Sequence, residues 1–191
     1  MRLGMNKRRT KKDFRFQETR LCFTLPATLG DRGKIPYERL NGPEDLARWL
    51  TELGFSDFPL EFSLEDLVIT KCVREAIQRA GEALASGRPF DTKDLDEINM
   101  IMVVPPPTPQ LSAEGQVIWK ISELRSVLSM ISRDFVELAT GPLAEHVKIC
   151  ANPDCRGVFV DESRPQNRRW CSMQTCGNLM KKSRIQKKVK P

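Results

Sequence analysis

The sequence contains one histidine and no long apolar segment, and each scarcity argues against a class of protein. Its single histidine, His146, leaves no recognisable Ser-His-Asp set, and no glycine-rich loop of the phosphate-binding kind is present. No run of 18 apolar residues occurs, which excludes a membrane-spanning helix, and Thr and Pro interrupt LCFTLPATL, which argues against a signal peptide. We therefore expect a cytoplasmic chain that is not an enzyme and has no catalytic residues.

The charges divide the chain into three parts. Residues 1–12 carry six Lys and Arg and no acidic residue, residues 13–147 carry 14 basic and 22 acidic residues, and residues 148–191 carry 11 basic and three acidic residues. This asymmetry indicates an acidic body and a basic end that meets an acidic partner. Residues 1–12 are expected to be a basic, flexible tail that is either solvated or in contact with phosphate.

Apolar spacing and capping residues predict three helices in the acidic part. The first is expected between Pro43 and Gly54 and the second between Ser63 and Gly87. The third is expected to start near Asp91 or Thr92 and to run to about Val104, before a run of prolines. The predicted buried face of the second helix comprises Leu64, Leu67, Val68, Cys72, Ala76, Ile77, Ala80 and Leu84.

The strongest helical pattern covers residues 121–138, where apolar residues repeat at intervals of three and four. The stripe consists of Ile121, Leu124, Leu128, Ile131, Phe135 and Leu138. Such a stripe is usually packed in the core, and the alternative is a homodimer seam through helix 121–138. Before it, residues 110–120 are predicted to form a strand or hairpin around Gly115.

These elements predict a mainly α (α+β) fold. Residues 13–146 are expected to form a helical domain with a small sheet, and residues 147–191 a separate module that ends in a basic helix.

Four cysteines near the basic end, Cys150, Cys155, Cys171 and Cys176, form the pattern C-x4-C-x15-C-x4-C. Two close pairs separated by a loop suit a tetrahedral zinc ion, and a reducing compartment favours metal over disulfides. We predict one structural Zn²⁺ held by the four thiolates, in a treble-clef-like four-cysteine zinc finger formed by residues 147–191. Four unrelated buried thiols and a disulfide pair are the alternatives.

The spacing of the second pair predicts an irregular turn. Cys171 and Cys176 would differ by about 140° on a regular helix, so the helix is expected to begin between residues 172 and 176. Ser172 or Thr175 is expected to cap it, its first amides to point at the thiolates, and Gly177 to admit backbone close to sulfur.

The loop between the pairs is predicted to supply the apolar cover of the metal. Residues 158–160 are expected to form a strand, and RRW, residues 168–170, its returning partner. Phe159 and Trp170 are expected to cover the site, with base stacking by Trp170 as an alternative. His146 is interpreted as a surface residue, with support of the metal site as the alternative.

Basic residues around the cysteines are candidates for nucleic-acid binding, because lysines and arginines neutralise phosphates and arginine and asparagine read base edges. The candidates are Arg164, Arg168, Arg169, Asn178, Lys181, Lys182, Arg184, Lys187 and Lys188. These residues predict that the module binds nucleic acid, with double-stranded DNA as the expected partner. A zinc module that docks RNA or an acidic protein and a thiolate-zinc redox sensor remain as alternatives.

Two parts of the sequence resemble known bacterial families. CANPDCRGVFVDESRPQNRRWCSMQTCGNLMKK resembles the CGNR zinc finger, and LCFTLPATLGDR and NGPEDLARWLTELG resemble the ABATE domain that accompanies it. The resemblance implies a stress-linked transcription regulator whose finger binds DNA and whose N-terminal domain senses a ligand. It also implies that the four cysteines are the metal ligands.

The sequence departs from both family patterns. Leu179 replaces the arginine of the Cys-Gly-Asn-Arg motif, so any nucleic-acid contact of that arginine is lost here. Thr24 stands where an Asp is usual and Ala27 where an Asn is usual. Together with Arg32, these two positions are the predicted ligand-binding residues, and their replacement implies altered sensing.

Overall fold

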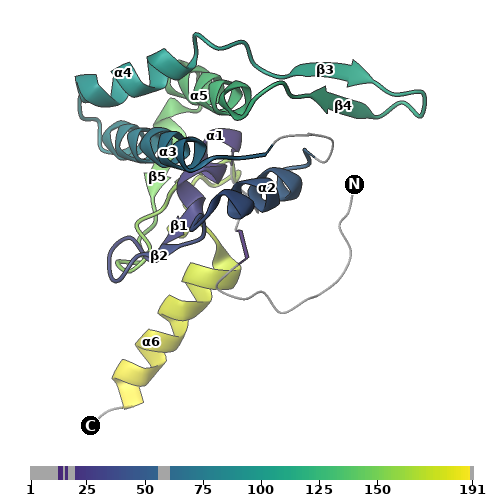
Figure 1. Cartoon of the computed structure of the whole chain (residues 1–191). Coiled ribbons are helices and arrows are strands. Elements are labelled where there is room, and N and C mark those ends of the chain that lie inside the picture. Colours follow the sequence, from purple (N-terminus) through teal and green to yellow (C-terminus); the bar gives the residue numbers. More distant parts are fainter. Residues whose placement is uncertain (1–12, 15, 17–19, 56–60, 190–191) are drawn as a thin grey trace.

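A computed structural model describes residues 13, 14, 16, 20–55 and 61–189; within its last helix, the side chains of Arg184 and residues 186–189 are not described (Figure 1). The predicted basic tail, residues 1–12, lies outside the described residues. None of the helices in the described ranges combines the length and the apolar character that crossing a membrane requires.

Helices dominate the described chain, and three two-stranded antiparallel sheets accompany them. The first half contains α1 (Leu21–Thr24), the 3-10 turn η1 (Pro26–Thr28), β1 (Leu29–Gly30), β2 (Tyr37–Glu38), α2 (Pro43–Glu52), α3 (Leu64–Ala85) and α4 (Thr92–Ile101). The second half contains β3 (Thr108–Leu111), β4 (Val117–Lys120), α5 (Leu124–Thr140), η2 (Ala144–His146), β5 (Val147–Ile149), β6 (Val158–Val160), the π-helical turn η3 (Met173–Gly177) and α6 (Asn178–Val189). The predicted mainly α (α+β) fold is confirmed.

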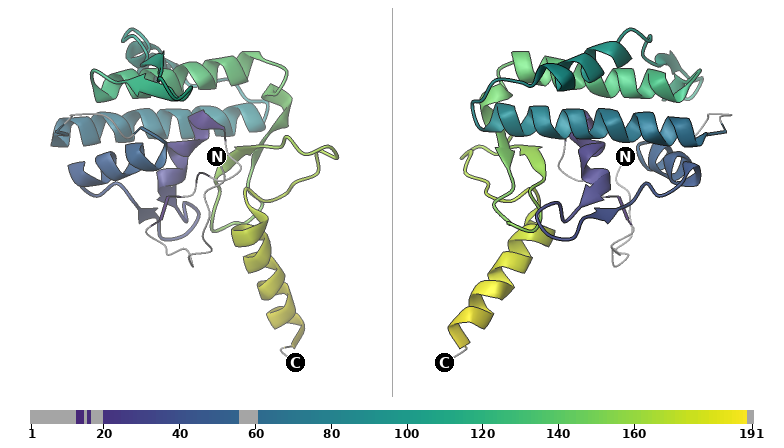
Figure 2. Two further views of the ribbon diagram at one scale, coloured as in Figure 1. Left: turned by 90° about the vertical axis from the view of Figure 1, so that its right-hand side faces the viewer. Right: turned by 60° about the vertical axis from the view of Figure 1, so that its left-hand side comes forward.

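The long helix α3 lies at the centre of the molecule. Figure 2 shows it between α4 and α5 on one side and α2 on the other, while α1 packs against both α3 and α5. α3 contacts all four of these helices. The largest side chains that are fully buried in this core include Trp49, Phe23, Leu25, Ile77, Leu128 and Ile131. Trp49 is therefore part of the core.

The predicted helix boundaries correspond closely to the observed ones because the capping chemistry is present. Ser63 accepts a hydrogen bond from the N–H of Asp66 and forms a capping box with it at the start of α3. Gly54 and Gly87 follow α2 and α3 with φ of 96° and 61°, a region that glycine adopts readily. The third helix ends at Ile101, three residues before the predicted end, in a turn that precedes the prolines.

The predicted buried face of α3 is partly wrong. Leu64 and Val68 are 70% and 59% exposed, and Cys72 is exposed as well, so Cys72 does not act as a core residue. Leu67, Ala76, Ile77 and Ala80 are buried as predicted, and Val73, which was not predicted, is buried with them, because α4, α5 and α1 pack against that side. The three exposed residues, Leu64, Val68 and Cys72, lie in the first half of α3.

The apolar stripe of α5 is buried within the chain. All six of its predicted residues are buried, and α1, α3 and α4 contact the helix. The core interpretation is therefore confirmed, whereas this face is not available for the predicted homodimer through helix 121–138 unless the core opens. The predicted hairpin is present as β3 and β4, which project from the body (Figure 1), with Gly115 at φ 74° in its turn.

Strands β5 and β6 form an antiparallel pair in which Val147 lies opposite Val160, and both strands pack on α3. Val147, Val158 and Val160 belong to the same buried cluster as the core of the helical layers. The domain division between residues 146 and 147 stays a prediction, but this cluster crosses it.

Candidate metal centre

The first cysteine pair lies at the tip of the β5–β6 hairpin. Cys150 directly follows β5, and its N–H donates to the Gly157 carbonyl. The turn between the cysteines is organised by the buried Asn152, whose Oδ1 accepts the Asp154 N–H at 3.2 Å and whose carbonyl accepts the N–H groups of Cys155 and Arg156. This local hydrogen bonding is typical of Asn in turns.

The second pair flanks the irregular turn that its spacing predicted. Residues 173–177 form a π-helical turn, in which the Gly177 N–H donates to the Ser172 carbonyl five residues earlier at 3.0 Å. This wider turn brings residues five apart to one side of the helix, which a regular α-helix could not do for Cys171 and Cys176. The regular helix α6 begins only at Asn178.

The four sulfur atoms form one compact cluster. All four lie within 4.8 Å of one another, and the distances from Cys171 Sγ to Cys155 Sγ and to Cys176 Sγ are both 3.7 Å. A tetrahedron of sulfurs at about 2.3 Å from a zinc ion has edges of about 3.8 Å. A disulfide would require about 2.0 Å, and all six cysteines are free thiols. The cluster therefore fits a tetrahedral metal ion.

Two backbone amides point at the sulfurs, but they are not those predicted. The Gly157 N–H donates to Cys155 Sγ at 3.4 Å, and the Cys171 N–H donates to Cys150 Sγ at 3.5 Å. No side chain caps η3, so the predicted caps Ser172 and Thr175 are wrong. The glycine beside a ligand sulfur is Gly157, because a Cβ there would lie 3.4 Å from Cys155 Sγ.

Gly177 has a different role from the predicted one. A Cβ at this position would lie 2.5 Å from Met173 Sδ and 3.2 Å from Trp170 Cδ1, so the glycine permits close packing inside the turn rather than against a ligand.

The thiols of the cluster share protons through their mutual hydrogen bonds. A hydrogen bond from Cys155, assisted by one from Cys171, lowers the pKa of Cys150 to about 7. Hydrogen bonding to Cys150 raises the pKa of Cys155 above its ordinary value, because the donor of such a bond is held in its protonated form. A cluster that concentrates negative charge on some sulfurs attracts a cation that can replace the remaining protons.

Aromatic and arginine side chains enclose the cluster. Phe159 is buried against Cys150 and Cys176, and Trp170 packs on the same group, as predicted. The Arg168 guanidinium lies 5.3 Å from the Phe159 ring centroid and donates from Nη2 to the Cys171 carbonyl at 2.9 Å. Arg168, predicted to contact nucleic acid, thus also supports the metal loop.

The predicted returning strand at RRW does not form. β6 pairs with β5, which precedes the first cysteine, and the backbone of Arg169 instead accepts a single hydrogen bond from the Ala151 N–H.

Sequence reasoning missed Asp161, which anchors the loop between the pairs. Its fully buried carboxylate lies 2.7 Å from Lys148 Nζ and accepts hydrogen bonds from Ser163 Oγ and from the N–H of Arg168. Burial alone would raise the pKa of Asp161, but these donors, Lys148 first among them, hold it well below its usual range. An acidic residue directly after the apolar strand VFV was the available signal.

The other predicted nucleic-acid residues lie on the loop and on α6. Arg164, Arg169, Lys181 and Lys182 are exposed, and the Asn178 side chain donates to the Gln174 carbonyl at 3.2 Å. The Arg169 guanidinium lies 5.2 Å from the Trp170 ring. Arg184, Lys187 and Lys188 lie on α6, and their side chains are outside the described ones. Figures 1 and 2 show α6 projecting away from the body, where its exposed lysines can be reached.

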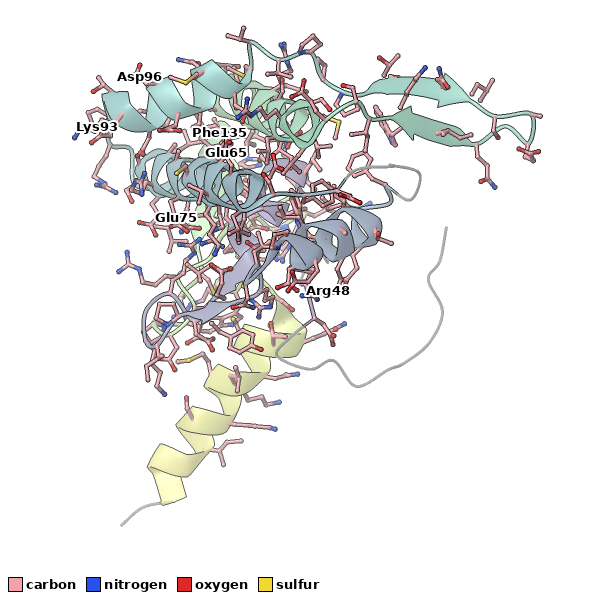
Figure 3. All side chains as sticks on the ribbon, in the orientation of Figure 1. Arg48, Glu65, Glu75, Lys93, Asp96 and Phe135 are labelled. Carbon is pink, nitrogen blue, oxygen red and sulfur yellow. The ribbon has the colours of Figure 1, made fainter. Side chains whose placement is uncertain are left out.

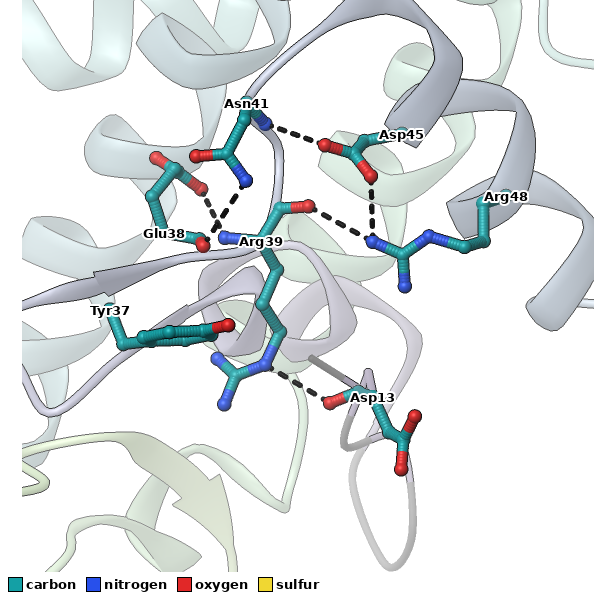
Figure 4. Close-up of a pocket in the computed structure, with 7 residues that line it drawn as sticks. All are labelled: Asp13, Tyr37, Glu38, Arg39, Asn41, Asp45 and Arg48. Atoms are coloured by element: carbon teal, nitrogen blue, oxygen red, sulfur yellow. Dashed lines mark hydrogen bonds and ion pairs between the residues drawn. The ribbon is translucent and has the colours of Figure 1, made fainter. Parts of the chain in front are cut away.

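None of the three predicted ligand residues, Thr24, Ala27 and Arg32, lines the cavity that the structure describes. Thr24 is buried and its hydroxyl donates to the Leu21 carbonyl at 2.6 Å, and the Arg32 guanidinium pairs with Glu75 at 2.7 Å. Ala27 offers only its carbonyl, 3.4 Å from an Arg39 nitrogen. A cavity of about 430 Å³ lies nearby, lined by Asp13, Tyr37, Glu38, Arg39, Asn41, Asp45 and Arg48 (Figure 4).

Comparison with known proteins identifies both parts of the chain. The ABATE family, described as "putative stress-induced transcription regulator", matches residues 19–142, and the CGNR zinc finger family matches residues 146–188. No curated protein matches the chain. The ABATE match covers most of the sequence and the helical layers, and the CGNR match contains all four clustered cysteines. The chain therefore belongs to the ABATE family and carries a CGNR zinc finger after its ABATE domain.

Proposed function

We propose that the four cysteines hold one structural zinc ion. The spacing of their sulfur atoms, 3.7 Å from Cys171 Sγ to both Cys155 Sγ and Cys176 Sγ, supports this more directly than any other observation. Four thiolates fill all positions of a tetrahedral ion, which leaves no open position for water or substrate. When bound, the ion supplies folding energy to a segment that has few apolar residues of its own. Free thiols agree with the expected cytoplasmic compartment.

We propose further that the zinc finger binds double-stranded DNA and that the protein regulates transcription. α6 is 12 residues long, or about 18 Å. Among the described helices and strands, only η3 makes extensive contact with it. A projecting helix of this size fits the major groove. Exposed Lys181 and Lys182 and the loop residue Arg164 would neutralise phosphates. The ABATE domain would then be the sensing part.

Binding of duplex DNA across a salt series tests this function. The affinity of the full chain for labelled duplexes should fall steeply with salt, and the slope of log affinity against log salt should become shallower by about 0.9 for each lysine removed in Lys181→Ala and Lys182→Ala. The matched control is Lys93→Ala, an exposed lysine on α4, which Figure 3 shows far from α6.

The outcomes separate the candidate functions. Sequence-dependent duplex binding that is lost when zinc is removed supports the proposal. No preference among duplex sequences at any salt concentration would overturn DNA regulation. Tighter binding of single-stranded RNA would also overturn it and would favour docking to RNA.

A further inference from the structure

The turn between Cys150 and Cys155 rests against the helical body through loop 31–36. The Gly33 N–H donates to the Asp154 carbonyl at 3.0 Å. A Cβ at Gly33 would overlap the carbonyl oxygen of Pro153, so any other residue would force the loop and the turn apart. This loop is more than 110 residues away from the turn in the sequence, so only the fold brings them together.

Helix α3 holds the other side of the same turn. Gln78 is 3% exposed, and its Nε2 donates to the Arg156 carbonyl at 3.2 Å and to Glu82 Oε1 at 2.9 Å. The Arg156 guanidinium lies 3.8 Å from Glu82. Arg156 has φ 52°, which is uncommon for a residue other than glycine, and it directly follows the ligand Cys155. Gln78 therefore supports the one backbone conformation that is unfavourable in this turn.

The β5–β6 hairpin beneath the cysteines also packs closely on α3. A Cβ at Gly81 would lie 3.2 Å from Val158 Cγ1 and 3.0 Å from Phe23 Cε1, so the absence of a side chain lets β6 approach the helix. Val158 follows Gly157, whose N–H donates to Cys155 Sγ. The body thus contacts the hairpin and both sides of the turn that carries the first cysteine pair.

We propose that loop 31–36 and α3 are positioning elements of the metal centre, so that the conformation of the ABATE domain sets the zinc affinity of the four-cysteine site. This inference rests on the proposed zinc binding. Loop 31–36 joins β1 to β2, and Tyr37 and Glu38 of β2 line the cavity of Figure 4. A change at the cavity wall would therefore reach the cysteine turn through one short backbone segment.

Zinc affinity of the full chain tests the inference, measured by competition with a chromogenic chelator. Gly33→Ala and Gln78→Met leave all four ligands in place, and each is expected to weaken zinc binding by about 10- to 100-fold, as loss of supporting contacts does at other metal sites. The control is Gly115→Ala, a glycine-to-alanine change in the β3–β4 turn whose added Cβ would have nothing within 4 Å, and its zinc affinity should equal that of the wild type.

Hydrogen exchange on the wild-type chain gives a second test that does not depend on a variant folding. The Gly33 amide should be protected when zinc is bound, lose protection when a chelator removes the metal, and regain it when zinc is restored. Wild-type affinity in both variants, or a Gly33 amide equally protected without zinc, would overturn the inference. A wild-type chain that takes up no zinc would instead overturn the proposed function as well.

Discussion

The helical body and the metal centre are stabilised by different interactions. The body buries a continuous apolar core that includes Trp49, Leu128 and Ile131. The metal centre has only Cys150, Phe159 and Cys176 as its buried cluster, with Trp170 packed at its side. Its long loop is held by the buried charge of Asp161.

The difference follows from how much apolar surface each part can bury. A segment of about 40 residues cannot form a sufficient core alone, so metal binding or contact with a larger domain must supply the missing free energy. This segment has the contact, because its hairpin contributes Val147, Val158 and Val160 to the core of the body, and its four clustered cysteines could hold a metal ion. The comparison predicts that damage to the metal site stays local, whereas damage to the core spreads.

The largest expected effect is that of removing one metal ligand. Cys155→Ser should reduce zinc content from one ion per chain to almost none, because a structural zinc site contributes about 10–16 kcal/mol at neutral pH. Residues 148–180 should lose their order while α3, α4 and α5 stay helical, since none of the ligands lies on these helices. Metal analysis and circular dichroism would measure the two effects.

The exposed Cys72 provides the control for that experiment. Cys72→Ser removes a thiol outside the cluster and should change neither zinc content nor helicity. A simultaneous loss of all helical signal in Cys155→Ser would contradict the comparison, because it would mean that the two regions fold as one unit.

A smaller effect is expected from a cavity in the body. Leu128→Ala removes a fully buried side chain and should lower the free energy of unfolding by about 2–5 kcal/mol, measured by urea titration. Zinc content should remain one ion per chain wherever the body stays folded. Val136→Ala on the same helix alters a side chain that is 37% exposed and should cost less than about 0.5 kcal/mol.

The smallest effect concerns the charge that holds the metal loop. Asp161→Asn should destabilise the loop by about 1.5–3 kcal/mol, because hydrogen bonds to a charged acceptor are lost or weakened. Exchange of the Ser163 and Arg168 amides, which donate to this carboxylate, would report the change. Glu162→Gln, an exposed neighbour, should leave both amides protected.

The pH dependence of this effect has a definite sign. The pKa of Asp161 is lower in the folded chain than in the unfolded one, so its contribution is complete above the ordinary value of about 4 and is lost as the pH falls towards the folded value. The difference between Asp161→Asn and the wild type should therefore be constant near neutral pH and narrow below about pH 4. A difference that grows on acidification would contradict the assigned role of Asp161.

Much of the body could be predicted because its signals are local. The capping box at Ser63 and the left-handed glycines at 54 and 87 act within a few residues, so they mark helix ends without knowledge of the fold. Which side of α3 faces inward was less predictable. Leu64, Val68 and Cys72 have helical spacing, but only the positions of α1, α4 and α5 decide that a neighbouring face is buried.

The cysteine spacing by itself determined that two thiol pairs could reach one ion and that the second pair needs an irregular turn, because these depend on the geometry of short segments. Only the tertiary structure decided which groups surround the four cysteines. It placed Gly33 and Gln78 on the cysteine turn and Asp161 beneath the loop, by contacts between residues far apart in the chain or by burial of a charge. Such contacts arise from packing, and the spacing of residues along the sequence does not predict them.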